Sequence, residues 1–254
     1  MLADFGGGTG FRAQARRMRA CQLARLKKML YLCFSMRSSV SPKIQEEKRM
    51  VPVQFITHHN ERYSYEEGAL LALEGGCKWV QLRIKNATDD EVEPLAIRLL
   101  EACRKHQATF IIDDRVELTK KVHADGVHLG KDDMSPVEAR SLLGEEYLIG
   151  GTANTLEDVI ALRRAGIDYI CCGPFRHTDA KSQLAPSLNL EGYRNILSAM
   201  NEQGISLPIC AIGGITRDDV PDLMRTGVRG IAVSGAVLRA TNPVLEMQAF
   251  IHSY

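Results

Sequence analysis

Short apolar runs and amphipathic segments alternate regularly from residue 50 onward, and this alternation constrains the fold more than any other feature. Each run is rich in Val, Ile or Leu and is followed by a segment with helical periodicity. Such runs are typical of strands buried in a parallel sheet. Strands are predicted at residues 51–57, 79–84, 109–113, 126–129, 148–152, 169–173, 208–213 and 230–235.

The segment 89–106 has the clearest helical pattern between these strands. Its apolar residues recur at spacings of three and four, acids begin it and basic residues end it, which matches the helix dipole. The segment 155–166 is similar, with Thr155 as the predicted N-cap and Gly166 just beyond the C-terminus. Helices are therefore predicted between successive strands.

Eight strand–helix units predict a (β/α)8 TIM barrel, an α/β fold with a single domain. A doubly wound open sheet is the alternative. It is disfavoured because no GxGxxG motif follows an early strand, and the glycine cluster near the N-terminus has no strand before it.

Residues 1–49 differ from the rest of the chain because basic residues outnumber acidic ones and no core periodicity follows the glycine cluster. The stretch 21–34 could form a basic amphipathic helix. Residues 16–34 could be mistaken for a signal peptide, but their apolar run, 29–34, is shorter than the ~7–15 residues that such a peptide needs. We expect residues 1–49 to be a leader that is disordered or not native, and residues 50–254 to be the catalytic barrel.

The net charge of +1 predicts no nucleic-acid or membrane partner, and no apolar run approaches the ~18 residues that a membrane helix needs. The seven cysteines are odd in number, are irregularly spaced and form no CxxC pair. This usage argues against a zinc site or a disulfide framework and predicts a reducing, cytoplasmic location.

Polar residues cluster where the second strand ends, and in a TIM barrel the active site lies at the C-terminal ends of the strands. Gln81, Arg83 and Lys85 are spaced by two, which places them on the interior face of the predicted strand. The alternative is an ion pair buried at the barrel floor. The position of Lys85 at the very end of the strand favours the mouth.

Acidic pairs follow the third and fourth strands, namely Asp113–Asp114 and Asp132–Asp133. Carboxylates without nearby Cys or His suit a hard cation such as Mg²⁺, held with waters and a substrate phosphate. For the second pair alone, capping of the next helix is the simpler explanation. Because adjacent strand residues point to opposite sides, Asp113 and Asp114 are expected to have different roles.

The remaining mouth loops are also suited to anions. The longest loop, 173–187, carries basic residues and is either a lid over an anionic substrate or a solvated surface loop. Glycine-rich turns follow the seventh and eighth strands and predict a phosphate site formed by backbone N–H groups. Two phosphorylated small molecules, one of them a diphosphate that needs Mg²⁺, fit this layout.

Six motifs in order, "VQLRIK", "DDRVEL", "DGVHLGKDD", "GPFRHTDAK", "AIGGIT" and "VSGAVL", resemble the thiamine-phosphate synthase family. The resemblance covers residues 50–250 and excludes the leader. It implies a Mg²⁺-dependent transferase of thiamine biosynthesis that joins hydroxymethylpyrimidine diphosphate to hydroxyethylthiazole phosphate. Pyrophosphate leaves first, and the thiazole nitrogen then attacks the pyrimidinylmethyl cation.

The resemblance also implies residue roles. The metal ligands would be Asp114 and Asp133. The residues that bind the pyrimidine diphosphate would be Gln81, Arg83, Lys85, Asp113, Thr152 and Lys181. The residues that hold the thiazole phosphate would be Thr178, Gly214, Val233 and Ser234. The catalytic residues would be Arg83, Lys85 and Lys181, which stabilise the departing charge.

Several positions depart from the usual pattern of the family. Thr152 replaces a serine, Asp113 an asparagine, Lys131 a glutamine, Asn154 a histidine and Ala180 a threonine. The phosphate and metal residues are kept, so the departures are expected to affect selectivity for the two rings.

Two other functions are considered beside the synthase, one enzymatic and one non-catalytic. One is a thiazole tautomerase with the same barrel, for which His177 would be the residue that transfers protons. The other is a non-catalytic protein that binds a phosphorylated ligand. Retention of all five diphosphate and metal residues favours the synthase: Arg83, Lys85, Asp114, Asp133 and Lys181. Homo-oligomerisation is left open.

Overall fold

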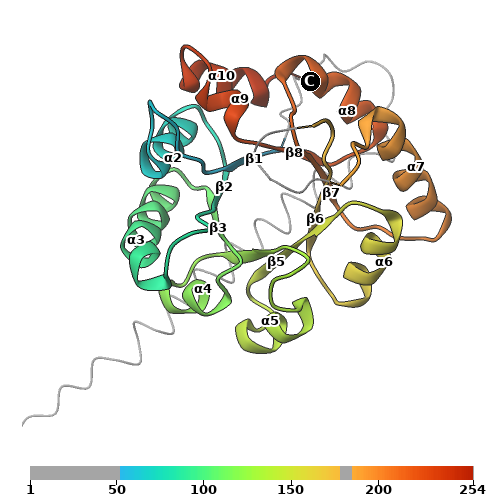
Figure 1. The fold of residues 1–254 in the computed structure, drawn as a ribbon, viewed down its shortest axis with the longest axis horizontal. Helices are drawn as coiled ribbons and strands as arrows, with labels where there is room; N and C mark the ends of the chain where they lie inside the picture. Colours follow the sequence, from blue (N-terminus) through green and yellow to red (C-terminus); the bar gives the residue numbers. More distant parts are fainter. Residues whose placement is uncertain (1–51, 178–184, 254) are drawn as a thin grey trace, which may run out of the picture. The chain divides into compact units, whose positions relative to one another are not determined.

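The computed structural model describes residues 52–177 and 185–253, and these residues form a closed barrel of parallel strands (Figure 1). The strands pair in chain order from β1 to β8, and β8 pairs with β1. The prediction of a single-domain (β/α)8 TIM barrel is confirmed, and the doubly wound alternative is wrong. The expectation for residues 1–49 lies outside the described residues.

All eight predicted strands occur, and most are a residue or more shorter than the sequence pattern indicated. In particular, the second strand ends two residues earlier than expected. The strands are β1 Val53–Ile56, β2 Trp79–Leu82, β3 Thr109–Asp113, β4 Gly126–Leu129, β5 Leu148–Ala153, β6 Tyr169–Cys172, β7 Ile209–Ile212 and β8 Gly230–Val233.

Helices surround the barrel on its outside (Figure 1). The predicted helix 89–106 is confirmed as α3, and Thr155 caps α6 as predicted, in a capping box with Asp158. The helices are α2 Tyr65–Glu74, α3 Asp89–Lys105, α4 Val116–Val122, α5 Pro136–Leu143, α6 Leu156–Arg164, α7 Asn189–Glu202, α8 Val220–Thr226, α9 Gly235–Leu238 and α10 Pro243–Ile251, and the 3-10 turn η1 Arg217–Asp219 precedes α8.

Side chains along each strand point alternately to the core between strands and helices and to the inside of the barrel. In β3, Phe110 and Ile112 are fully buried in the main core between strands and helices, where each contributes about 1.5–3 kcal/mol of stabilisation. A smaller cluster around Tyr169 and Cys171 fills the inside of the barrel. Asp113 follows Ile112 by one residue, so it points to the inside of the barrel.

Among the residues that the structure describes, no helix is both long enough and apolar enough to cross a membrane.

Candidate active site

A cluster of charges lies where β2 and β3 end. The Lys85 Nζ atom is 2.9 Å from Asp113 Oδ2, and the Arg83 Nε atom is 3.5 Å from the same oxygen. The Asp113 side chain is only 8% exposed, whereas that of Lys85 is 41% exposed. Because β2 ends at Leu82, both cations lie beyond the strand. The ion pair is therefore at the mouth, and its placement at the barrel floor is wrong.

Asp114 does not continue β3. Its backbone is left-handed, with φ of 72°, and its N–H donates to the carbonyl oxygen of His128 at 2.8 Å. As a result Asp114 Oδ2 also approaches Lys85 Nζ, at 3.7 Å. The expectation that Asp113 and Asp114 lie on opposite sides is wrong, because the turn brings both carboxylates to one ammonium. Left-handed conformations of non-glycine residues concentrate at functional sites.

Asp133 approaches Asp114 from the loop after β4. Its Oδ2 atom accepts a hydrogen bond from the Gly130 N–H at 2.6 Å, within its own loop. Ser135 is the N-cap of α5, in a capping box with Glu138. The explanation of the second acidic pair as a helix cap is therefore wrong, and the Asp133 carboxylate is left to face Asp114.

The pKa values of this cluster reflect crowded charges. Burial raises the pKa of Asp114, and the neighbouring Asp133 carboxyl group raises it further, while Lys85 opposes the rise. Burial alone would lower the pKa of Lys85, but the charges of Asp113, Asp133 and Asp114 raise it. Asp114 and Asp133 are the carboxylates that could hold a divalent cation here. Within the described part of the chain, no group of three or more His, Cys, Asp or Glu forms a complete metal site.

Polar residues line the barrel interior below this cluster. Gln81 is 1% exposed, and its Nε2 atom has no hydrogen-bond partner among the described residues. Thr152 Oγ1 is 3.0 Å from His128 Nε2, and His128 Nδ1 is 3.3 Å from the hydroxyl of Tyr169. His128 was missed by the sequence analysis. The available signal was a polar residue at an inward position of a buried strand, paired in register with Asp113.

The turns after β7 and β8 expose backbone N–H groups. Gly213 and Gly214 both have positive φ, of 101° and 65°. Among the described residues, the N–H groups of Gly214 and Ser234 have no hydrogen-bond partner. Val233 is the last residue of β8 and pairs with Phe55 of β1. The predicted phosphate-binding residues at these two strand ends thus lie at the same mouth.

Further cations lie near the β8 turn. Arg239 extends back over the start of α9, where its Nη1 atom would be 2.3 Å from a Cβ atom added at Gly235. Burial lowers the pKa of His58, and the positive charges of His59, Arg83 and Arg239 lower it further. His58 and Arg239 were not predicted from the sequence, because barrel closure between β1 and β8 brings them to the mouth.

The departures from the family pattern connect neighbouring loops. The Lys131 Nζ atom is 2.7 Å from Asp158 Oδ2 on α6, and the Asn154 side chain donates to the Gly173 carbonyl oxygen. These two residues therefore tie the loops after β4, β5 and β6 together. The remaining predicted residues, Thr178, Ala180 and Lys181, lie outside the described residues.

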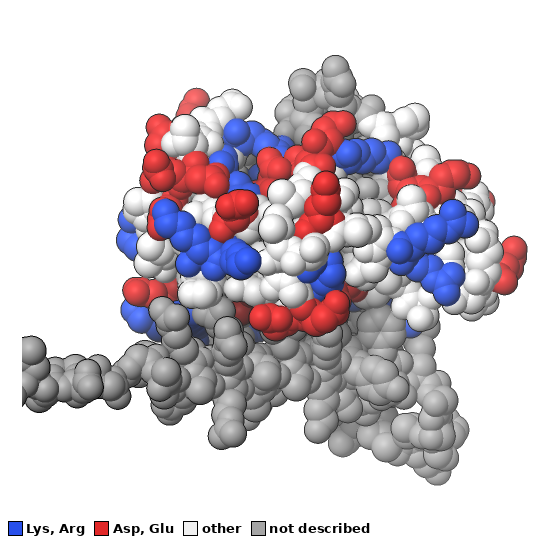
Figure 2. Space-filling view, turned by 90° about the horizontal axis from the view of Figure 1, so that it is seen from below, with Lys and Arg blue, Asp and Glu red and all other residues white. Residues whose placement is uncertain are grey.

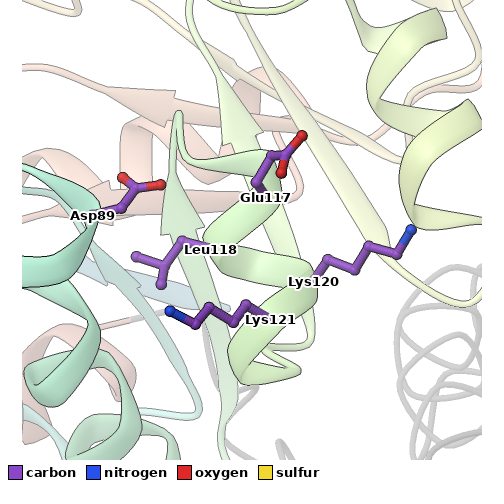
Figure 3. Close-up of a pocket in the computed structure, with 5 residues that line it drawn as sticks. All are labelled: Asp89, Glu117, Leu118, Lys120 and Lys121. Carbon is purple, nitrogen blue, oxygen red and sulfur yellow. The ribbon is translucent and has the colours of Figure 1, made fainter.

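One side of the outer surface carries charges of both signs. On the side of the barrel seen in Figure 2, Lys and Arg alternate with Asp and Glu, without an extended patch of one sign. A hollow of about 430 Å³ lies between α3 and α4 (Figure 3). Its charges are partly paired, because Asp89 binds Arg115 and Lys121 binds Glu93. The lining residues are Asp89, Glu117, Leu118, Lys120 and Lys121.

Comparison with known proteins identifies the family of this chain. Residues 53–237 match the family described as thiamine monophosphate synthase. The chain is 57% identical to the thiamine-phosphate synthase of Phocaeicola vulgatus, over 81% of this chain and 99% of that protein. It is 56% identical to the thiamine-phosphate synthase of Bacteroides thetaiotaomicron, over 80% of this chain and 97% of the relative.

A solved structure gives the same result for the fold. The thiamine phosphate pyrophosphorylase of Pyrococcus furiosus superposes with a TM-score of 0.69 at 33% identity, over 80% of this chain and 95% of that one. The family match over residues 53–237 and the high identity to curated relatives show that the chain belongs to the thiamine monophosphate synthase family.

Proposed function

We propose that this chain is a thiamine-phosphate synthase, a transferase that joins hydroxymethylpyrimidine diphosphate to hydroxyethylthiazole phosphate and releases pyrophosphate. One observation carries the proposal within the family: a cation–carboxylate cluster at β2–β4 and a turn with free N–H groups at β7–β8 share one barrel mouth. The first suits a diphosphate with a metal ion, and the second suits a phosphate monoester.

The β2 side is assigned to the pyrimidine diphosphate. Arg83 and Lys85 carry the positive charge for its phosphates, and Asp113 holds the two cations in place before the substrate arrives. The buried Gln81 Nε2 atom has no partner among the described residues, a state that costs about 1–3 kcal/mol until an acceptor such as a ring nitrogen satisfies it. Thr152, positioned by His128, adds a hydroxyl to the same side of the barrel interior.

Asp114 and Asp133 fit Mg²⁺ by their donor set. They supply hard oxygens from adjacent loops, and burial, followed by the nearness of the Asp133 carboxyl group, raises the pKa of Asp114. Two carboxylates are the number that Mg²⁺ commonly takes from a protein when waters and substrate phosphates complete its octahedron. When bound, the ion would neutralise the negative charge that develops on pyrophosphate.

The β7–β8 side is assigned to the thiazole phosphate. The N–H groups of Gly214 and Ser234, which have no partner in the described part of the chain, would donate to phosphate oxygens. Val233 and Thr178 complete the proposed set. Holding the thiazole by its phosphate places its ring nitrogen opposite the pyrimidinylmethyl carbon. Such orientation removes much of the entropy cost of joining two substrates.

The residues then act on charge as the bonds change. The bond between the methylene carbon and the diphosphate oxygen breaks, and its electron pair leaves with pyrophosphate. Arg83, Lys85 and Lys181 stabilise this departing charge, and the thiazole nitrogen donates its lone pair to the methylene carbon to form the new C–N bond.

One assay tests the proposal. The purified protein is incubated with both substrates and Mg²⁺, and thiamine phosphate and pyrophosphate are measured. Equal amounts of the two products are expected. Isomerisation of a thiazole phosphate without condensation would instead identify a tautomerase, and binding without turnover would identify a non-catalytic phosphate-binding protein.

A further inference from the structure

Arg176 belongs to the chain that leaves β6 and runs along the turn after β7. Two successive backbone N–H groups donate hydrogen bonds to this turn. The Phe175 N–H donates to the Ile212 oxygen at 2.7 Å, and the Arg176 N–H donates to the Gly213 oxygen at 3.1 Å. The Arg176 side chain then donates from Nη1 to the Gly214 oxygen at 2.9 Å. Three consecutive carbonyl groups of the turn are thus fixed by residues 175 and 176.

Fixing a carbonyl group also fixes the next N–H group. In a trans peptide the carbonyl and the following N–H lie in one plane and point in opposite directions. Because the Gly213 and Gly214 oxygens point toward Arg176, the N–H groups of Gly214 and Ile215 point away from it. Neither N–H has a hydrogen-bond partner among the described residues, so both are available to an anion.

A bidentate ion pair holds the Arg176 guanidinium in this position. Its Nη1 and Nη2 atoms lie 2.7 and 2.6 Å from the two carboxylate oxygens of Asp219. Asp219 Oδ2 also accepts hydrogen bonds from the N–H and hydroxyl of Thr216, both at 2.7 Å. The guanidinium lies 4.6 Å from the centre of the Phe175 ring. Only arginine supplies both the planar fork and the stacking surface.

Gly214 is adapted to this clamp. A Cβ atom there would lie 2.4 Å from Arg176 Cγ, and the φ of 65° disfavours other residues as well. Although burial alone would raise the pKa of Asp219, hydrogen bonds from Arg176 and Thr216 hold it below the ordinary value. Asp219 therefore stays ionised at neutral pH and the clamp persists.

We propose that Arg176, clamped by Asp219, is a positioning residue for the thiazole phosphate, because it aims the Gly214 and Ile215 N–H groups at the phosphate. The inference rests on the proposed function and extends it to residues that do not touch substrate. Arg176 acts on the β7 turn, whereas Arg83, Lys85 and Asp113 lie where β2 and β3 end. These two strands are across the barrel from β7 (Figure 1). The effect of Arg176 is specific to one of the two substrates.

The test compares Arg176→Lys and Asp219→Asn with the wild-type protein in steady-state kinetics. Each variant is expected to raise KM for hydroxyethylthiazole phosphate by about tenfold, as when one charge-assisted hydrogen bond is misdirected. KM for the pyrimidine diphosphate and kcat are expected to stay within about twofold of the wild-type values, because residues on the β2 side of the mouth determine them. The preference for thiazole phosphate over the unphosphorylated thiazole alcohol should fall by the same factor as the affinity.

Arg98→Lys is the matched control. Arg98 also makes a two-point ion pair, with Glu66 at 2.8 Å for both contacts, but on the outer helices α3 and α2. Its loss should leave both KM values unchanged. Equal increases in both KM values, or an unchanged phosphate preference in a folded Arg176→Lys protein, would overturn the inference.

Calorimetric titration with hydroxyethylthiazole phosphate separates this inference from the proposed function. A wild-type protein that makes no thiamine phosphate would refute the proposed function. The inference would still stand if thiazole phosphate bound the wild type more tightly than Arg176→Lys, and equal or absent binding would refute it.

Discussion

Asp113→Asn is the substitution that most directly tests the charge balance of the mouth. The family resemblance places an amide at this position, and the change keeps the size of the side chain while removing its charge. In the structure the carboxylate is 8% exposed and lies 2.9 Å from Lys85 Nζ and 3.5 Å from Arg83 Nε. The substitution therefore releases two cations from one buried anion.

The cost to stability follows from these distances. Two unit charges 2.9 Å apart attract by about 6 kcal/mol at an effective dielectric constant of 20. The desolvation of a buried carboxylate costs several kcal/mol and cancels most of this gain. Lys85 stays partly solvated after the change, so the free energy of unfolding should fall by only about 1–3 kcal/mol.

The effect on substrate binding should have the opposite sign. With Asp113 neutral, Arg83 and Lys85 keep their full charge for the diphosphate, so KM for the pyrimidine diphosphate should stay equal or fall. Asp114→Asn is the matched comparison, because it makes the same chemical change one residue later at a proposed Mg²⁺ ligand. That variant should lose turnover by roughly 10² or more and should need more Mg²⁺ for half-maximal rate.

The assay measures thiamine phosphate formation over a range of pyrimidine diphosphate and Mg²⁺ concentrations, and urea unfolding gives the stability of each variant. A folded Asp113→Asn protein without activity would refute this reasoning and would mean that the carboxylate itself takes part in the reaction. Equal kinetic effects of the two substitutions would show that Asp113 and Asp114 have the same role.

Three further predictions follow from the structure and the proposed roles. Lys181→Ala should reduce kcat by roughly 10² or more, measured by pyrophosphate release, and an unchanged rate would remove its proposed contact with the leaving group. The pKa of Asp219 is lower in the folded state than in the unfolded state, so its ion pair should stabilise the protein at pH values above the unfolded-state pKa. This contribution is lost as pH falls through the folded-state pKa. In urea unfolding at several pH values, Asp219→Asn should therefore weaken the pH dependence of the free energy of unfolding below about pH 4. Lys131→Gln should change the free energy of unfolding by less than about 1 kcal/mol, because its ion pair with Asp158 is 46% exposed on the lysine side; a loss above 2 kcal/mol would show that the loop contact matters more than its exposure indicates.

The sequence alone predicted most of the local structure. Strand and helix positions follow from the spacing of apolar residues, and Thr155 was found as an N-cap because capping depends on only a few neighbouring residues. The order of strands and helices predicted the barrel, since each buried strand requires a helix to cover it. The same order predicted that the polar residues at strand ends would gather at one mouth.

Side-chain directions at the strand ends were less predictable. Period-two reasoning assumed that β2 continues to Lys85 and β3 to Asp114, but the strands end at Leu82 and Asp113. Beyond those points the backbone is set by hydrogen bonds to neighbouring strands, such as that from Asp114 to the His128 oxygen. Both aspartates consequently face Lys85.

Contacts between distant residues were decided by the tertiary structure alone. Arg176 and Asp219 are 43 residues apart, and His128 and Tyr169 are 41 apart, so no local pattern links them. Each pair forms because closing the barrel brings neighbouring loops or inward strand positions together. The sequence by itself determined which groups reach the mouth, through the periodicity of apolar residues and the order of strands and helices. The ion pairs of these groups and the directions in which they point depend on long-range packing, which only the closed barrel supplies.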